Sequence, residues 1–565
     1  MRARRRRPSV IWLLATAFLS LGLINLDFSR GWWRGQLRRL AVGVPVVGVL
    51  CYVTLPPLVF PQALALLLVT LVPNVLITSL SAARTMVISR RIVSLRRTPV
   101  WPLALSVGVI AAFALVLAVA PIVDASGLRD LTGVVTSASG APATDPRHVR
   151  VVPEESAIFA GEKVVGQLGA YYRVGDYNVQ SDGGRLVWVA PLDFQGAVQW
   201  LARRTSPGVV IVNAENPDAP AELRARTPLR YVPSALFNDN LRRHVWLRYG
   251  SELLLEETLQ IDAQGNPRYL VTLGRPTIGW SGERVTAVVI VDPATGAMER
   301  IPREEFDRLP KWVSRVYPPD LVLEYNDWFG RYVHGWWNAQ ITKRDVHLPA
   351  RDEVFGVLLA DGRFVWFVDH TSPNRTDASM TGFTYTDSRT GAMTYYTSSG
   401  GEYNSKAAED AVGGNPIVKQ GRLVPTQPVL YALFGQNTWV VPAVADNGKF
   451  QTLALLQAAG GHVVVGNTGA SSPAQDAFAS YRAFLGDSST GGASPRITGT
   501  IDRFAYANGR AWFTLRGRRG IYTIVDPAGP DVLLARPGDV VSFETSADEG
   551  GGLIVRGFAD AALGR

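Results

Sequence analysis

The sequence predicts an N-terminal α-helical transmembrane bundle, then extracytoplasmic α+β repeat modules of a helix plus antiparallel strands, and finally a C-terminal small β-barrel. Three observations lead to this fold class. Long apolar stretches are confined to the first 121 residues, two nearly identical turns recur in the middle of the chain, and the residues from 496 onward read as short strands without a helix.

The membrane region, residues 1–121, contains four apolar segments, at 9–26, 40–60, 61–81 and 100–121. At a rise of 1.5 Å per residue, the shortest reaches about 27 Å, close to the roughly 30 Å of a bilayer's hydrocarbon core. A cleaved signal peptide is the alternative for the first segment, but no small-x-small cleavage site follows it. We therefore expect a multi-pass anchor, in which segment 9–26 either crosses the bilayer or dips into one leaflet and returns.

Positive charge is concentrated in this region. The whole chain has 57 Lys and Arg against 48 Asp and Glu, but residues 1–121 alone hold fourteen arginines and a single acid, Asp27. The basic excess is therefore no sign of nucleic-acid binding. The positive-inside rule favours the arginines at 30–39 and 84–97 on the cytoplasmic side over those at 2–7. We expect a bacterial cell membrane protein whose chain is extracytoplasmic from about residue 122.

Outside the membrane region, the composition changes. Residues 122–150 are rich in Ser, Thr, Gly, Ala and Pro, as is typical of a flexible linker. Alternating strand patterns with intervening amphipathic helices then predict four α+β modules, at 151–235, 236–310, 311–400 and 401–495. In the fourth module the register of the repeat is not defined by the sequence.

A repeated turn is the clearest internal signal. Asp292, Thr295 and Gly296 return 95 residues later as Asp387, Thr390 and Gly391. An Asp side chain can accept a hydrogen bond from the backbone two residues on, and Gly supplies positive φ at the exit of a tight reversal. We therefore predict that all six residues are structural and that each turn follows a strand of its module.

A helix followed by three strands and closed by an Asp-x-x-Thr-Gly turn resembles the PepSY-like repeat of bacterial envelope proteins. The resemblance covers roughly residues 151–467, and the wider layout resembles a family of multi-span bacterial membrane proteins. It implies an extracytoplasmic module tied to protease restraint or membrane-protein regulation, and it brings no catalytic residues. Residues 496–565 resemble a small OB-like β-barrel. Because that part is expected outside the cytoplasm, nucleic acid is disfavoured as its ligand.

The sequence lacks the common catalytic motifs. It contains no Walker A motif, no HExxH and no EF-hand loop, its six histidines include no i, i+4 pair, and its one cysteine, Cys51, excludes an intrachain disulfide. We predict no catalytic residue, metal or cofactor, and a non-enzymatic envelope protein that binds, scaffolds or regulates another envelope protein. The alternatives are an accessory subunit of an envelope assembly or export machine, and a hydrolase whose site is assembled from separated residues.

An aromatic cluster supplies the one candidate for a partner contact. Trp328, Tyr332 and Trp336 recur every four residues and would form one stripe on a helix over 320–337 that packs on the sheet of its module. Trp337 would point about 100° away from that stripe. We therefore expect Trp337 to contact a partner. For the protein as a whole, the expected partners are the lipid bilayer, through the apolar segments, and an envelope protein.

Overall fold

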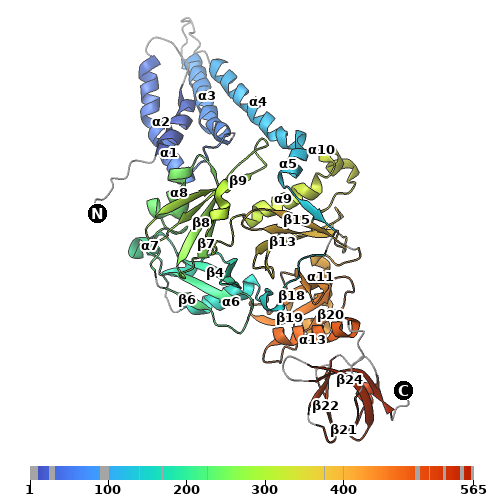
Figure 1. Cartoon of the computed structure of the whole chain (residues 1–565). Coiled ribbons are helices and arrows are strands. Elements are labelled where there is room, and N and C mark those ends of the chain that lie inside the picture. Colours follow the sequence, from blue (N-terminus) through green and yellow to red (C-terminus); the bar gives the residue numbers. More distant parts are fainter. Residues whose placement is uncertain are drawn as a thin grey trace. The chain divides into compact units, whose positions relative to one another are not determined.

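The computed structural model divides the chain into two compact units (Figure 1). Unit 1 comprises residues 1–142, 147–150 and 157–404, and unit 2 comprises 143–146, 151–156 and 405–565. The residues that the structure describes are 10–24, 32–60, 62–88, 101–138, 140–166, 170–225, 227–374, 376–398, 400–489, 497–507, 510–518, 520–525, 530–547 and 553–561.

The apolar N-terminal part of unit 1 is helical, with α1 (Val10–Ser20), η1 (Leu21–Leu23), α2 (Trp32–Thr54), α3 (Gln62–Ile88) and α4 (Trp101–Val123). Within the described part, two helices are long and apolar enough to cross a bilayer, Trp33–Thr54 and Ala104–Val123. The apolar helix Val10–Leu23 is shorter, and the 27-residue α3 is apolar over Gln62–Leu76. The predicted bundle of four spans is therefore wrong. The predicted arginine clusters at 2–7 and 90–97, and Arg30, lie outside the described residues.

The end of α2 is fixed to the sheets of unit 1 through α8 (Leu241–Tyr249). Trp246 donates from Nε1 to the Pro56 carbonyl oxygen at 3.0 Å, and Arg243 donates from Nε to the Tyr52 carbonyl oxygen at 2.9 Å. The buried Trp246 ring also joins an apolar cluster with residues of α1 and α2, namely Ala15, Leu19, Val47 and Cys51. The helices are thus attached to the sheets by both hydrogen bonds and packing.

The segment predicted as a flexible linker, 122–150, carries regular structure. α5 (Ala125–Leu131) is capped by Asp124, whose carboxylate accepts from the Gly127 N–H at 3.1 Å, and it packs on α9 (Pro319–Arg331). β1 (Val135–Ser137) pairs in parallel with β15 (Met393–Thr397). Tertiary contacts therefore give structure to a stretch whose composition alone is typical of a tether.

Unit 1 contains three sheets. The first has the order β2-β4-β5-β6, with β3 also paired to β4, and the second has the order β10-β9-β8-β7. The third has the order β1-β15-β14-β13-β11, with β12 paired to β13. Their bounds are β2 (Tyr172–Val174), β3 (Asn178–Asp182), β4 (Arg185–Phe194), β5 (Val209–Asn213), β6 (Glu222–Arg224), β7 (Leu253–Ile261), β8 (Pro267–Arg275), β9 (Arg284–Val291), β10 (Met298–Pro302), β11 (Leu348–Pro349), β12 (Phe355–Leu358), β13 (Phe364–Thr371) and β14 (Gly382–Asp387).

One continuous apolar core joins the first two sheets of unit 1. It contains inward-facing residues of both sheets together with residues of α7 (Ala197–Arg203) and α8, among them Val189, Trp200, Ile211, Val245, Leu259, Val271 and Val289. The remaining helices of the described chain before residue 405 are α6 (Glu154–Val165), α10 (Gly335–Trp337), η2 (Pro146–His148), η4 (Phe237–Asp239), η5 (Arg303–Arg308) and η6 (Asn338–Thr342).

The two repeated turns occupy equivalent places in the second and third sheets. The first joins β9 to β10 and the second joins β14 to β15, each between antiparallel neighbours. The carbonyl oxygen of Pro293 accepts two successive backbone N–H groups, of Arg230 and Tyr231, at 2.8 and 2.9 Å. The repeat read from the sequence is therefore present as paired structural turns.

The second turn shows the same contacts. The carbonyl oxygen of Ser388 accepts from the N–H groups of Val316 and Tyr317, both at 2.8 Å. Gly296 and Gly391 have φ of +74° and +75°, and a Cβ on either would clash with a tyrosine ring, of Tyr231 or Tyr317. In both turns glycine is required by the backbone and by the neighbouring tyrosine.

Unit 2 consists of a five-stranded sheet and a closed barrel. The sheet has the order β16-β18-β19-β20 with β17 paired to β18, and the barrel closes as β21-β22-β23-β25-β24. The predicted domain boundary at 495/496 lies outside the described residues. The elements are α11 (Ser405–Gly414), α12 (Pro416–Gln420), β16 (Val424–Pro425), β17 (Val429–Leu433), β18 (Gln436–Val444), β19 (Phe450–Gln457), β20 (Val463–Val465), α13 (Pro473–Ser489), β21 (Ile497–Ala507), β22 (Arg510–Leu515), β23 (Tyr522–Val525), α14 (Pro530–Leu534), β24 (Val540–Ala547) and β25 (Leu553–Asp560).

The predicted fold class is wrong in its membrane bundle and in its repeat modules, whereas its C-terminal β-barrel corresponds to the closed barrel of β21 to β25. The described chain forms four open sheets besides that barrel, and two of its helices are long and apolar enough to cross a bilayer. The predicted modules also differ from a helix followed by three strands. In the first sheet α7 lies between β4 and β5, and the third sheet includes β1, which lies outside the predicted module. Local patterns specify strands and turns, but pairing between strands far apart in sequence depends on tertiary contacts.

We predict that Gly391→Ala destabilises unit 1 more than Gly362→Ala does. Both glycines have positive φ, so each alanine carries a left-handed cost of about 1–2 kcal/mol. At Gly391 the new Cβ would also lie 2.3 Å from the Tyr317 ring, whereas at Gly362 nothing lies within 4 Å. Overpacking adds roughly 1–3 kcal/mol. Urea unfolding of both variants measures the difference, and equal losses would contradict the packing role of Gly391.

Candidate functional site

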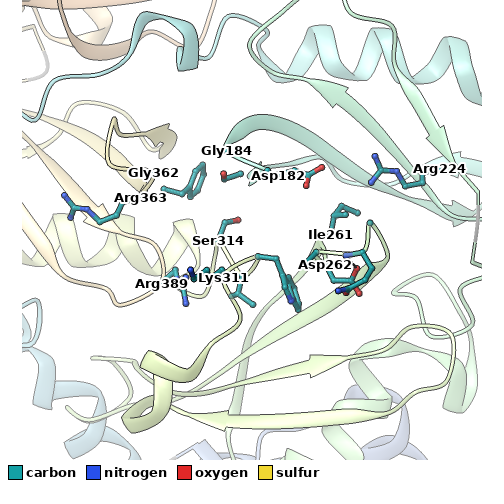
Figure 2. A pocket seen from close by; sticks show the side chains of 18 of the residues that line it. Asp182, Gly184, Arg224, Ile261, Asp262, Lys311, Ser314, Gly362, Arg363 and Arg389 are labelled. Carbon is teal, nitrogen blue, oxygen red and sulfur yellow. Dashed lines mark hydrogen bonds between the residues drawn. The ribbon is translucent and has the colours of Figure 1, made fainter.

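A cleft of about 760 Å³ opens in unit 1 where turns from all three sheets converge (Figure 2). Its lining includes the β3–β4 turn at Asp182–Gly184, the β7–β8 turn at Asp262–Gly265 and the β14–β15 turn at Asp387–Arg389. The start of β13 at Gly362–Phe364 and the segment Lys311–Ser314 complete it. The volume lies within the range of small-molecule sites.

The turns are shaped by their own aspartates. Asp262 Oδ1 accepts from the N–H groups of Gln264 and Asn266 at 3.0 and 2.8 Å. Asp387 Oδ1 accepts from the N–H groups of Arg389 and Thr390 at 3.0 and 2.9 Å. Both carboxylates are thus held in place by the backbone, which makes the cleft wall a preformed polar surface.

Several charges at the cleft are neutralised locally. Arg268 bridges two of the turns, with its guanidinium 3.0 Å from Asp262 and 2.8 Å from Asp292. Hydrogen bonds from the backbone and from Arg268 lower the pKa of Asp292 against the opposing effect of its partial burial. Glu222 and Arg224 form a further ion pair at 3.0 Å. Within these ion pairs the positive and negative charges largely cancel.

Two other charges at the cleft form no ion pair among the described residues, although Glu222 and, to a smaller extent, the charge of Asp182 raise the pKa of Arg224. Lys311 is exposed and makes no hydrogen bond or ion pair with any residue in the described ranges, and Asp182 likewise forms no ion pair there. Arg389 donates to the Leu309 carbonyl oxygen at 3.0 Å and not to a carboxylate. In Figure 2, Lys311 and Arg389 lie toward one end of the cleft, while Asp182 lies away from them on the side of Arg224. The cleft is therefore polar along its length.

Just beyond the cleft, the chain turns into the interior at Arg315, which is buried. Its Nη2 lies 3.1 Å from Glu256 Oε1, its Nη1 donates to the Val179 carbonyl oxygen at 3.3 Å, and its guanidinium sits 4.6 Å from the Trp366 ring. Burial lowers the pKa of Arg315, and the nearby Glu256 opposes that shift. This residue ties the cleft segment to β3, β7 and β13.

A buried amide holds the same segment from the other side. Gln260 accepts at Oε1 from the Ser314 N–H at 2.9 Å and donates from Nε2 to the Arg315 carbonyl oxygen at 2.7 Å. Since Gln260 is itself fully buried in β7, the backbone of the cleft segment cannot shift without leaving polar groups unpaired.

A second polar cluster of unit 1 surrounds two histidines, His370 on β13 and His347 just before β11. His347 Nδ1 and His370 Nδ1 are 2.9 Å apart, and His370 Nε2 lies 2.8 Å from Asn326 Oδ1. Thr384 also donates to Asn326 Oδ1, at 2.6 Å, while Asn326 Nδ2 donates to the Val322 carbonyl oxygen at 2.8 Å. The amide is thus oriented with its oxygen toward His370.

The hydrogen bonds assign both tautomers. Asn326 Oδ1 only accepts, so His370 carries its proton on Nε2 and accepts at Nδ1 from His347. Burial lowers the pKa of His370 far below its usual value. Burial, with a contribution from Arg129, lowers the pKa of His347 to about 4. Both rings are therefore neutral at pH 7, and Nε2 of His347 keeps its lone pair.

No group of three or more His, Cys, Asp or Glu side chains placed to hold a metal ion occurs among the residues that the structure describes. The histidine pair supplies two nitrogens that face each other. It is thus a hydrogen-bonded relay between β13 and the chain before β11.

Of the residues predicted from the sequence, Asp387 alone lines the cleft. The other five turn residues, Thr390, Gly391, Asp292, Thr295 and Gly296, shape the two turns. Trp337 lies on α10 with 72% of its surface exposed. The predicted helix over 320–337 is wrong, because α9 ends at Arg331 and a turn precedes α10; Trp328 is therefore buried on α9 while Trp336 belongs to another helix.

Sequence reasoning missed the cleft and the histidine pair. The Asp-Gly turns were a usable signal for hairpins, but nothing local shows that turns of three sheets converge. His347 and His370 are 23 residues apart and meet only through the pairing of β11 with β13.

Comparisons with known proteins give few matches. No family model matches the chain, and no curated protein matches it significantly. Among solved structures, cobalt-substituted apocarotenoid oxygenase (ACO) from Synechocystis matches at 9% identity and a TM-score of 0.14, over 55% of this chain and 49% of that chain. An ACO/RPE65 chimera matches at 8% identity and a TM-score of 0.13, over 53% and 48%. The chain spans about half the length of these structures.

None of these comparisons supports the predicted non-enzymatic envelope scaffold or the accessory-subunit role, and we retain neither. The similarity is too low to carry oxygenase chemistry to this chain. No match identifies PepSY-like repeats or an OB-like domain, so both resemblances stay predictions.

We predict that the free energy of unfolding falls by about 2 kcal/mol between pH 7 and pH 5 because of His347. Its folded-state pKa of about 4 lies below the roughly 6.5 of an unfolded histidine. The neutral ring thus contributes stability that is present above pH 6.5 and is lost as the pH falls from there toward 4.

Urea unfolding at both pH values tests this, with His347→Phe expected to reduce the difference. His334→Gln, at an exposed histidine, is the control and should leave the pH dependence intact. An equal pH dependence in wild type and His347→Phe would refute the assignment.

Proposed function

We propose that unit 1 binds a small zwitterionic solute, of the size of a short peptide, in the cleft. The observation that carries the proposal is a pair of charges of opposite sign at separate places on the lining, Lys311 and Asp182, neither of which forms an ion pair with a described residue (Figure 2). A free carboxylate fits Lys311 and Arg389, and an ammonium group fits Asp182. The turn backbones and Trp312 supply the polar and apolar surface between the two ends.

Preorganisation supports binding at this place. The turn aspartates are held by backbone N–H groups, and Gln260 and Arg315 fix the segment that carries Lys311. A site that needs little ordering on binding loses less of its interaction energy to entropy. A cleft of about 760 Å³ also leaves room for a tripeptide with bound water.

The test uses three matched probes: triglycine, N-acetyl-triglycine, which lacks the ammonium group, and triglycinamide, which lacks the carboxylate. We expect triglycine to bind most tightly, with a loss of about tenfold or more for each blocked end, since a charge-assisted hydrogen bond contributes roughly 1.5–3 kcal/mol. Titration calorimetry on the full chain measures this.

Two variants test which residue binds each end of the peptide. Lys311→Ala should abolish the difference between triglycine and triglycinamide, and Asp182→Asn should abolish that between triglycine and N-acetyl-triglycine. Lys343→Ala, at an exposed lysine that does not line the cleft, is the control. Absence of saturable binding, or equal affinity for all three probes, would refute the proposal.

We also propose that α2 and α4 anchor unit 1 in a cell membrane, that the 27-residue α3 returns across it between them, and that the chain beyond residue 122 lies outside the cytoplasm. The C-terminal ends of both helices meet the sheets, α2 through α8 and α4 through α5. Arg34, Arg38 and Arg39 lie in the first turns of α2, at its opposite end. The positive-inside rule then favours the cytoplasm at that end.

Alkaline phosphatase fusions test this orientation, because the reporter is active only outside the cytoplasm. A fusion after Asp124 should be active, and a fusion after residue 90, within the arginine cluster of the sequence, should be inactive. Activity at 90 without activity at 124 would overturn the orientation.

A further inference from the structure

A compact exposed apolar surface lies at the edge of unit 1 next to the end of α4. Trp337 and Ile341 are 72% and 66% exposed, and they are four residues apart on the continuous helical turns of α10 and η6. That spacing places both side chains on one face. We call this pair of residues the α10 face. Large apolar residues exposed side by side on a folded surface indicate a contact with something apolar.

The α10 face has a rigid support. The Trp336 ring packs edge-to-face on that of Trp337, with centroids 5.1 Å apart. Asn338 donates from Nδ2 to the Arg344 carbonyl oxygen at 2.9 Å, and its own carbonyl oxygen accepts from the Lys343 N–H at 2.7 Å. The exposed side chains are therefore presented in a fixed arrangement and belong to a built surface.

The position of the α10 face relative to α4 identifies what covers it. α4 runs directly into α5, and α10 packs against α5 (Figure 1). Val123, the last residue of α4, is 80% exposed. The α10 face thus lies beside the point where the most apolar helix of the described chain leaves the sheets. At the end of a membrane span, this is the level of the boundary between headgroups and acyl chains.

Charge complements the apolar side chains. Lys343 and Arg344, two and three residues after Ile341, are both exposed. Arg344 lies 3.4 Å from Asp345, which also lies 3.0 Å from His334. A tryptophan and an isoleucine bordered by cations match the arrangement by which interfacial segments bind anionic membranes, with apolar groups below the headgroups and cations among them.

A second exposed aromatic lies beside the other candidate span. Phe237 is 61% exposed and has a φ of +52°, which is costly for a bulky side chain. The following residue, Asn238, accepts at Oδ1 from the Tyr52 hydroxyl at 2.9 Å, close to the end of α2. The two ends of the candidate spans are thus each accompanied by an exposed aromatic ring.

We propose that the α10 face and Phe237 insert into the interfacial region of the bilayer and seat unit 1 on it at two points. The inference rests on the membrane attachment proposed above and adds a definite ligand, lipid at the headgroup and acyl boundary, for Trp337. The inference also places lipid contact and solute binding at different parts of unit 1. The cleft turn at Asp262–Gly265 lies at the end of β7 that is away from α8 and α2.

Spin labels on the full chain in vesicles containing phosphatidylglycerol test the proposal. On a Cys51→Ala background, nitroxides are attached after Trp337→Cys, Ile341→Cys, Phe237→Cys or Ala263→Cys. The first three labels should be more accessible to oxygen, which concentrates in lipid, than to a water-soluble nickel complex. The label at 263, on an exposed turn of the cleft, should show the opposite preference.

Different outcomes contradict different claims. If the chain is extracted from the vesicles by alkaline carbonate, the attachment through α2 and α4 is wrong, and this inference falls with it. If the chain resists extraction but the labels at 337 and 341 are as water-accessible as that at 263, this inference alone is overturned. Protection of both labels from oxygen and nickel would also overturn it, since a second copy or another protein would then cover the α10 face.

A matched pair of variants keeps folding separate from membrane contact. Trp337→Ala should leave the urea midpoint unchanged because the ring is exposed, whereas Trp328→Ala should lower the urea midpoint clearly because that ring is buried. A large loss of stability in Trp337→Ala would show that the ring packs within unit 1 and would overturn the proposal.

Discussion

Three sheets of unit 1 meet at one buried cation. The guanidinium of Arg315 reaches β3 through the Val179 carbonyl, β7 through Glu256 and β13 through the face of Trp366. A buried charge that loses a partner is costly, so each contact constrains the position of the sheet that supplies it. Because Arg315 directly follows the cleft segment, the geometry of the cleft depends on the same contacts that hold the sheets together. Binding surface and framework are thereby parts of one polar network.

The features that could be predicted from the sequence are those with a local cause. The turns at Asp292 and Asp387 were recognisable because an aspartate and a glycine impose the reversal by themselves. The apolar stretches of α2, α3 and α4 were recognisable from hydropathy, but the stretch 9–26 gave a shorter apolar helix, Val10–Leu23, because composition does not say where a helix ends. The aromatic stripe failed for the same reason, since the helix stops at Arg331.

What escaped prediction has a non-local cause. Arg315 and Gln260 have nothing unusual around them in the sequence, and their roles arise from burial between sheets. The histidine relay requires β11 to pair with β13 and α9 to lie across them, so no spacing of histidines could have indicated it. The cleft likewise exists only because turns distant in sequence converge. Its charges, and not a distant likeness to oxygenases, are what the proposed function depends on.

The parallel pairing of β1 with β15 has a consequence for biosynthesis. About 260 residues separate Val135 from its partner Thr394, so at roughly 5–20 residues per second β1 waits on the order of 10–50 s for its neighbour to be made. During that interval its edge has no strand to pair with, and α4 has already been completed. Final assembly of this sheet is therefore a late event in synthesis, which exposes the nascent chain to mispairing and makes it dependent on whatever shields unpaired strand edges while the chain is made.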